Sequence, residues 1–155
     1  MARVNNVCCN QFSFNLCSYN CRGFNFVKKE YINRLLTKCD ILLQQEHWLA
    51  ETQLSDLASI NDMFLYHGMS GFGNEEVLIG RPYGGCAILW RSDLNFRVDV
   101  IATSSRRCAV RICTDTWRSL VINVYMPFED GSERSDLFVE TLHSSQLLLL
   151  MQIVM

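Results

Sequence analysis

The sequence predicts an α/β fold in which helices cover the outside of a pair of β-sheets. Two observations predict it. A strand pattern at residues 12–20, a helical pattern and a second strand pattern at 41–45 follow one another in the first third of the chain. Several short strand patterns then follow in quick succession from residue 86, with connections too short for crossover helices. This order of elements is typical of mixed α/β architecture.

The first strands and helix are predicted by the spacing of apolar residues. Residues 12–20 begin with apolar–polar alternation, and Asn25 is a favoured residue type for the N-cap of the helix that follows. One apolar stripe of that helix consists of Val27, Tyr31, Ile32, Leu35 and Leu36. The continuous run Ile41-Leu42-Leu43 predicts a strand buried on both faces. We expect the strands at 12–20 and 41–45 to be central neighbours, covered by a helix over 28–38.

A short helix, a strand and a loop are predicted next. Thr52 is a plausible cap for the short helix. One side of that helix carries Leu54, Leu57 and Ala58. Residues 63–69 predict a strand, and residues 68–85, which contain six of the eight glycines, predict a long surface loop.

The second half of the chain predicts a meander and a last helix. Its strands are expected at 86–91, 96–103, 107–113 and 119–126, and should build much of the second sheet. From Ser132 a helix is predicted, with Leu137, Phe138, Thr141 and Leu142 at helical spacing. The pattern breaks at 144–145, and residues 147–151 are apolar all round, which departs from an amphipathic surface.

Composition indicates one globular domain over residues 1–155. Hydrophobic residues make up 49% of the chain and charged residues 19%, which excludes a disordered protein. The net charge of −2 argues against a protein that holds nucleic acid by its whole surface, so any DNA contact must depend on a local patch.

The cysteines favour a reducing compartment. The eight are Cys8, Cys9, Cys17, Cys21, Cys39, Cys86, Cys108 and Cys113. None forms a Cys-x-x-Cys motif or stands at zinc spacing from a histidine pair, so we expect reduced, partly buried thiols. No signal-peptide pattern is present, and the apolar stretch at 147–155 is shorter than the roughly 20 residues of a membrane span. We therefore expect an intracellular protein, nuclear or cytoplasmic, with no membrane association and no stable protein partner.

Three short motifs at predicted strand ends carry the chemistry. They are SerTyrAsnCysArgGly at 18–23, LeuGlnGlnGluHisTrpLeu at 43–49 and AsnValTyrMetPro at 123–127. Each places a polar side chain, namely Asn20, Glu46 or Tyr125, at the end of a strand that is predicted to be buried. A carboxylate can ligate Mg²⁺, an amide can donate to a phosphate oxygen, and a phenol can stabilise a transition state by hydrogen bonding.

Each residue has an ordinary interpretation when taken alone. Asn20 is a common turn residue, Glu46 could be a solvated surface group, and Tyr125 could be a core tyrosine whose hydroxyl reaches water. The specificity of the pattern lies in the order and spacing of the three motifs.

Together the motifs resemble the endonuclease/exonuclease/phosphatase superfamily. The GlnGluHisTrpLeu motif, the segment GlyArgProTyrGlyGlyCysAlaIleLeuTrp at 80–90 and AsnValTyrMetPro are most similar to the apurinic-endonuclease-type endonuclease domain of non-LTR retrotransposons. The resemblance runs over about residues 14–138, most of the chain.

The resemblance implies a four-layer α/β/β/α sandwich of the deoxyribonuclease I-like type. It implies a Mg²⁺-dependent, or Mn²⁺-dependent, phosphodiester-hydrolysing endonuclease site that acts on DNA. Glu46 would be the metal ligand, and Asn20 and Tyr125 would bind phosphate or the transition state. His47 does not match the family's catalytic histidine, and we expect it on the surface or packed near Trp48. His143 matches no family motif, so a helix-surface position is expected.

Two departures from the family pattern bear on whether this chain can cleave DNA. The sequence contains neither the family's GlyAsp-x-Asn motif nor its Ser-Asp-His motif. We therefore interpret it as a C-terminally truncated, incomplete domain with an aberrant tail at 144–155, inactive in cleavage. The alternatives are a non-catalytic interaction or binding module on the same scaffold, and a phosphatase or phosphodiesterase of the superfamily.

Overall fold

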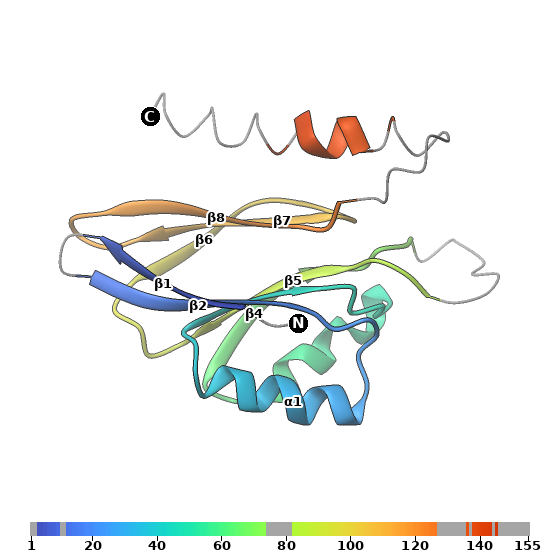
Figure 1. Cartoon of the computed structure of the whole chain (residues 1–155), viewed down its shortest axis with the longest axis horizontal. Helices are drawn as coiled ribbons and strands as arrows, with labels where there is room; N and C mark the ends of the chain where they lie inside the picture. The colour runs from blue at the N-terminus through green and yellow to red at the C-terminus, as the bar shows by residue number, and fades with distance from the viewer. Residues whose placement is uncertain are drawn as a thin grey trace.

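Two β-sheets stack face to face between outer helical layers (Figure 1). The computed structural model describes residues 3–9, 12–73, 82–126, 136, 138–143 and 145, with side chains described from Ser13 onward. One sheet is covered on its outer side by α1 and the 3₁₀ helix η1, and the described C-terminal helical residues lie beyond the other sheet. The predicted α/β/β/α arrangement is therefore confirmed.

The first sheet has the strand order β1-β2-β3-β5-β4. Its strands are β1 (Arg3–Cys9), β2 (Phe12–Asn20), β3 (Ile41–Gln45), β4 (Phe64–Met69) and β5 (Cys86–Arg91). The prediction that β2 and β3 are neighbours is confirmed: they pair in parallel, with Asn20 opposite Gln45. The other pairs are antiparallel. The sequence analysis did not predict β1, which has no clear apolar alternation.

The second sheet contains β6 (Arg97–Ser104), β7 (Arg107–Cys113) and β8 (Arg118–Val124), all antiparallel. The prediction that the strand at 86–91 begins this meander is wrong, because β5 lies between β3 and β4 in the first sheet. Its residues Cys86, Ala87, Ile88 and Leu89 are all buried. A strand that is buried on both faces needs covering layers on both sides, which an internal position in the first sheet provides.

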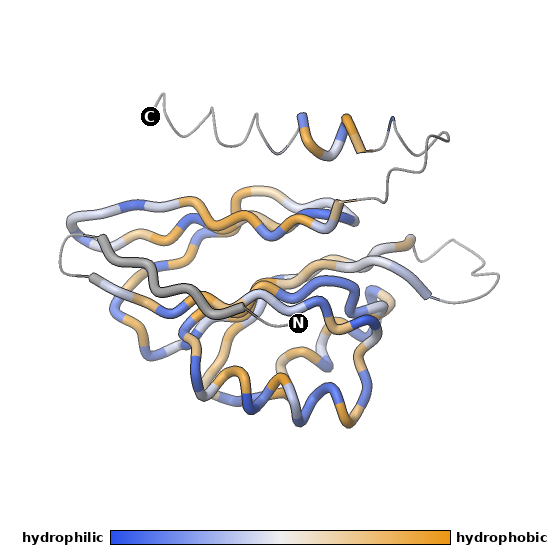
Figure 2. The backbone as a smooth tube through the Cα atoms, viewed as in Figure 1, coloured by the Kyte–Doolittle hydropathy of each residue, from blue (hydrophilic) through white to orange (hydrophobic). Residues whose placement is uncertain are grey.

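Helix α1 (Phe26–Leu36) begins at the predicted cap. The side chain of Asn25 accepts a hydrogen bond of 2.9 Å from the backbone N–H of Lys28. The apolar stripe is narrower than predicted, because only Ile32 and Leu36 are buried. Val27 is 73% exposed and Tyr31 43% exposed. Figure 2 shows hydrophilic and hydrophobic residues alternating along this helix, as expected for one that covers a sheet with one face.

The short helix after β3 is a 3₁₀ helix, η1 (Glu51–Ile60). Its buried residues are Leu54, Leu57 and Ile60. This spacing of three follows from the three residues per turn of a 3₁₀ helix, so the predicted contact residue Ala58 is exposed. Thr52 is not the cap. Ala50 holds that position, and its backbone N–H donates to Oε1 of Gln53 at 3.1 Å.

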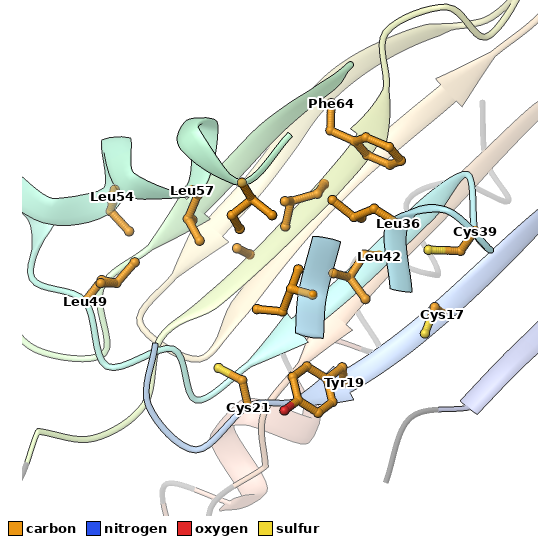
Figure 3. Close-up of a cluster of buried hydrophobic side chains, with 14 residues drawn as sticks. Cys17, Tyr19, Cys21, Leu36, Cys39, Leu42, Leu49, Leu54, Leu57 and Phe64 are labelled. Carbon is orange, nitrogen blue, oxygen red and sulfur yellow. The ribbon is translucent and has the colours of Figure 1, made fainter. Parts of the chain in front are cut away.

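Two cores stabilise the sandwich, one on each face of β3. Leu42 faces the cluster between the first sheet and its helices, which includes Cys17, Leu36 and Leu57 (Figure 3). Ile41 faces the cluster between the two sheets. The prediction that β3 is buried on both faces is therefore confirmed.

Several predicted boundaries differ from the structure by one or two residues. Met63 is 52% exposed and precedes β4, whereas Gly68 belongs to that strand rather than to the loop. β6 begins and ends one residue later than predicted, and β8 starts one residue earlier and ends two earlier. In the C-terminal helix, Thr141 is buried, Leu142 is 42% exposed and His143 is on the surface as expected. The predicted helix start at Ser132, Leu137 and the tail at 147–155 lie outside the described residues.

Six cysteines are described, and all are free thiols, as predicted. They are Cys17, Cys21, Cys39, Cys86, Cys108 and Cys113. The side chains of Cys8 and Cys9 lie outside the described residues. Within the described part of the chain, none of the helices is long and apolar enough to cross a membrane.

Candidate functional site

The three predicted site residues lie at the ends of β2, β3 and β8, at one edge of the sandwich. β2 and β3 run parallel, so their carboxyl ends meet at the same edge. β8 is tied to this edge by Asn123, a buried residue whose side-chain amide donates hydrogen bonds of 2.8 Å to the carbonyl oxygens of Gln44 and Ala87. Because alternate residues of a strand share a face, Tyr125 points toward the first sheet as Asn123 does.

The side chains of Asn20 and Tyr125 both contact the carboxylate of Glu46. Nδ2 of Asn20 donates a hydrogen bond of 3.0 Å to Oε1 of Glu46. The hydroxyl of Tyr125 also donates a hydrogen bond to the Glu46 carboxylate. The backbone N–H of Arg22 donates to Oδ1 of Asn20 at 3.2 Å, which turns the amide group toward Glu46. The structure thus brings the three residues together; their catalytic and metal-binding roles stay a prediction.

Tyr125 is held as a protonated donor. Burial raises the pKa of its hydroxyl, and the hydrogen bond and negative charge of Glu46 raise it further, against the opposing charge of Arg106. The Arg106 guanidinium lies over the tyrosine ring, 5.6 Å from the ring centroid, and Tyr125 N donates to Arg106 O at 2.9 Å. Sequence reasoning missed Arg106, because only the pairing of β7 with β8 shows that it neighbours Tyr125.

Glu46 sits on a strained loop that the surrounding backbone holds in place. Glu46 and Trp48 have φ values of 53° and 60°, in the left-handed region that costs a residue with a side chain on the order of 1 kcal/mol or more. The backbone N–H of Gly23 donates to Glu46 O at 2.7 Å, and that of Phe24 donates to His47 O at 2.9 Å. The loop after β2 therefore supports the loop after β3.

Of the two positions expected for His47, on the surface or packed near Trp48, the surface position is wrong, because the side chain is fully buried. Nε2 donates to Met69 O at 3.0 Å, and Nδ1 accepts from Leu49 N at 3.0 Å. Burial lowers the pKa of the imidazole to about 4, so it is neutral near pH 7. A Cβ on Gly85 would overlap the ring. No local sequence pattern signals this position, since Met69 and Gly85 are distant in the chain.

The donor set at Glu46 suits a hard divalent cation that the substrate helps to ligate. Among the described residues, no group of three or more histidine, cysteine, aspartate or glutamate side chains could hold a metal ion. Glu46 instead offers one carboxylate beside an amide and a phenol. Mg²⁺ is commonly bound through one or two carboxylates together with substrate phosphate, so this arrangement fits Mg²⁺ or Mn²⁺ better than a closed zinc site.

A pocket of about 360 Å³ lies next to the site. Its described lining consists of Glu51, Met69, Ser70, Gly71, Phe72, Gly73 and Ser105. Met69 is also the hydrogen-bond partner of His47, and Ser105 precedes Arg106 in the chain. The pocket has small, hydroxyl-bearing and aromatic lining but no cationic side chain among these residues. Because Asn20, Glu46 and Tyr125 are not among the lining residues, the pocket is a neighbour of the carboxylate site and not the site itself.

Comparison with known proteins agrees with this fold. One similar solved structure is the endonuclease domain of TRAS1, a telomere-specific non-LTR retrotransposon, with a TM-score of 0.56 and 17% identity over 83% of this chain and 52% of that chain. Another is the 3′ phosphatase NExo from Neisseria bound to a product DNA hairpin, with a TM-score of 0.62 and 18% identity over 90% of this chain and 52% of that chain. The AP endonuclease LMAP from Leishmania major has a TM-score of 0.53 and 14% identity over 72% of this chain and 40% of that chain.

At these identities the solved structures show a shared fold, and the chain spans about half the length of the first of them. No curated protein matches the sequence. Residues 17–151 match the sequence profile of the Endonuclease/Exonuclease/phosphatase family. With most of its length matched and the same fold, the chain belongs to the Endonuclease/Exonuclease/phosphatase family.

Proposed function

We propose that the chain supplies the metal-binding half of a divalent-metal-dependent phosphodiesterase that acts on DNA, of the retrotransposon endonuclease type. The observation that carries the proposal is the contact of Glu46 with both Asn20 and Tyr125 at one edge of the sandwich. The GlnGluHisTrpLeu and AsnValTyrMetPro motifs and the likeness to the TRAS1 domain support the retrotransposon type.

Glu46 is the residue that would hold the metal. A divalent ion there would neutralise phosphate charge. The amide of Asn20 and the protonated phenol of Tyr125 are two neutral donors beside the carboxylate, and they would hydrogen-bond phosphate oxygens. Neutral donors suit this place because, unlike a cationic side chain, they bind an anion without competing with the metal for the Glu46 carboxylate.

Arg106 would supply the local positive charge that an acidic protein needs to bind DNA. The chain carries a net charge of −2. The ion pairs formed by the described residues are Arg91–Asp40, Arg91–Asp93 and Arg97–Asp99, and none of them includes Arg106. A guanidinium that lies over Tyr125 without such a pair is available to a phosphate oxygen.

A second candidate is a DNA-binding module without catalysis. The specific observation in its favour is that these 155 residues contain neither GlyAsp-x-Asn nor Ser-Asp-His, so no matched residue positions or deprotonates water. Under this alternative the site would bind a phosphodiester through Arg106 and Tyr125, and the metal would contribute little.

Mn²⁺ binding to the full 155-residue chain, followed by electron paramagnetic resonance, tests the metal site. We expect Glu46→Gln to weaken Mn²⁺ binding at least tenfold, because it removes the one carboxylate of the donor set. Glu30→Gln is the matched control, since Glu30 is exposed on α1 and makes the same change of charge. Equal Mn²⁺ affinity in the wild type and Glu46→Gln would contradict the proposal.

Fluorescence anisotropy with a labelled duplex separates the two candidate functions. The metal-dependent site predicts DNA binding that Mg²⁺ strengthens, and Glu46→Gln should abolish that effect of Mg²⁺. The binding module predicts equal affinity in Mg²⁺ and in EDTA. A 3′-phosphorylated oligonucleotide, compared with its 3′-hydroxyl form, shows whether the site prefers a phosphomonoester, as a phosphatase would.

A further inference from the structure

We propose that His47 is a positioning residue: its buried imidazole clamps the loop at 46–49 between the ends of β4 and β5 and thereby holds Glu46 in its metal-binding orientation. The inference rests on the proposed function of Glu46. It concerns a side chain for which the sequence motifs predict no role.

The loop needs support on two sides because its backbone is strained. Glu46 and Trp48 both adopt positive φ values, which L-residues occupy at a cost. On one side, the backbone N–H groups of Gly23 and Phe24 donate to the carbonyl oxygens of Glu46 and His47. On the other side, the described residues that support the loop are the His47 ring, through Met69 O, and Gly84, whose carbonyl oxygen accepts from Trp48 N at 3.1 Å.

The two ring nitrogens of His47 connect different parts of the structure. Nδ1 accepts from Leu49 N within the loop, so Nδ1 is unprotonated and the proton is on Nε2. Nε2 then donates to Met69 O, the carbonyl at the end of β4. One neutral side chain therefore fixes the shape of the loop and joins it to the edge of the sheet.

Gly85 provides the space for the ring. It has a φ of 84°, and a Cβ at this position would overlap three atoms of the imidazole. The residue before it, Gly84, accepts the hydrogen bond from Trp48 and also has a positive φ. Gly84 and Gly85, the two residues before β5, are thus the surface against which the loop that carries Glu46 packs.

His47 acts through Glu46 and not on the substrate. Its side chain has no exposed surface, and each of its ring nitrogens already has a backbone partner. A general acid or base must reach the proton it transfers, directly or through one water. Hydrogen bonds that orient a metal ligand commonly contribute about 10- to 100-fold to metal affinity, and His47 would contribute in this range by holding the backbone that carries Glu46.

Substitutions in the full chain, measured by Mn²⁺ electron paramagnetic resonance, test the clamp. His47→Leu removes both hydrogen bonds, and Gly85→Ala displaces the ring while leaving the histidine in place; we expect each to weaken Mn²⁺ binding roughly tenfold or more. His47→Gln can keep a donor near the Nε2 position and should recover part of the affinity. Leu57→Ala, in the helix-side core, controls for lost stability: it should lower the melting temperature without changing Mn²⁺ affinity.

The outcomes distinguish the clamp from the proposed function. Loss of Mn²⁺ binding in Glu46→Gln but wild-type affinity in folded His47→Leu and Gly85→Ala overturns the clamp alone. Unchanged affinity in Glu46→Gln contradicts the proposed function itself. Should His47→Leu not fold, long-range ¹H–¹⁵N spectra of wild-type His47 decide: a single Nε2–H tautomer supports the clamp, and a mixture of tautomers overturns it.

Discussion

The side-chain amide of Asn20 donates a hydrogen bond of 3.0 Å to Oε1 of Glu46, although 26 residues separate the two in the chain. Parallel pairing of β2 with β3 places the strand ends together, and the bond from Cys21 N to Gln45 O extends that pairing to the first residue beyond the strand. The contact between Asn20 and Glu46 therefore both links the ends of these two strands and positions the carboxylate that we propose binds the metal.

Asn20→Asp should make the stability of the protein depend on divalent metal. Two carboxylates at hydrogen-bond distance repel each other unless one takes a proton or a cation binds between them. We expect a lower melting temperature than the wild type in EDTA, and a larger rise on adding Mg²⁺, because a ligand that binds only the folded state stabilises it.

Asn25→Asp is the control for this prediction. It makes the same change of charge at the N-cap of α1, where aspartate caps as well as asparagine does. Its melting temperature should respond to Mg²⁺ as the wild type does. Identical Mg²⁺ responses in all three proteins, measured by thermal unfolding, would show that Asn20 does not face a metal-binding carboxylate.

Arg106→Ala should weaken binding to duplex DNA and flatten its dependence on salt. Loss of one phosphate contact lowers the slope of log affinity against log salt concentration by about 1. Arg118→Ala removes the same charge from an exposed residue at the other end of β8, so its slope should equal that of the wild type. Anisotropy titrations at several salt concentrations measure both, and equal slopes for the two variants would contradict a phosphate contact at Arg106.

The buried thiols should make the protein less stable in alkali. Burial raises the pKa of Cys39, with help from the nearby Cys17 and Asp40, and burial raises that of Cys108; both reach about 12. In the unfolded chain these thiols ionise from about pH 8.5, so between that pH and about 12 the unfolded state holds fewer protons. The free energy of unfolding should therefore fall as pH rises, by about 1.4 kcal/mol per pH unit for each thiol once it ionises in the unfolded chain.

Urea unfolding under reducing conditions between pH 8 and pH 10.5 measures this slope. Cys39→Ala should make the decrease of the unfolding free energy with pH smaller, because one thiol fewer ionises in the unfolded chain. It should also lower stability at every pH by opening a small cavity. A free energy of unfolding that stays constant across this range would show that these thiols are less buried than the structure has them.

Local patterns predicted much of the fold, because short-range physics decides those features. Asn25 begins α1 through its own side-chain bond to Lys28, and the run Ile41-Leu42-Leu43 is apolar because both faces of β3 are covered. The position of β5 was not predictable in this way. Its apolar run indicates burial, but pairing with β3 and β4 depends on segments distant in the sequence.

In the candidate site, too, residues set by local sequence were predicted, and residues set by contacts with distant segments were not. Asn20, Glu46 and Tyr125 were predicted from strand-end motifs, and in the structure Asn20 and Tyr125 both contact Glu46. His47 and Arg106 were not predicted as parts of the site, because their partners come from other strands: Met69 for the ring and Tyr125 for the guanidinium. Asn123 lies in a recognised motif, but its bonds to Gln44 and Ala87 exist only once the sheets are stacked.

The 155-residue polypeptide should not nick supercoiled plasmid DNA in Mg²⁺ at a measurable rate. Hydrolysis needs charge neutralisation at the phosphate, donors for the transition state and a group that positions or deprotonates water. Glu46, Asn20 and Tyr125 can serve the first two needs, whereas no residue matches the family motifs for the third. General-base catalysis contributes about 10²- to 10⁴-fold, and the donors of a Ser-Asp-His motif would add on the order of 10²-fold or more, so we expect the two losses together to leave nicking too slow to measure.

The plasmid assay must separate a working partial site from a contaminating nuclease. Wild type, Glu46→Ala and Glu30→Ala are purified in parallel and assayed in Mg²⁺ and in EDTA, since Glu30 is an exposed residue of α1 outside the site. Equal background nicking in all three is the expected result. Mg²⁺-dependent nicking in the wild type and Glu30→Ala that disappears in Glu46→Ala would mean that the residues present suffice for catalysis. Water activation would then come from a group other than the two absent motifs, and the non-catalytic alternative would be excluded.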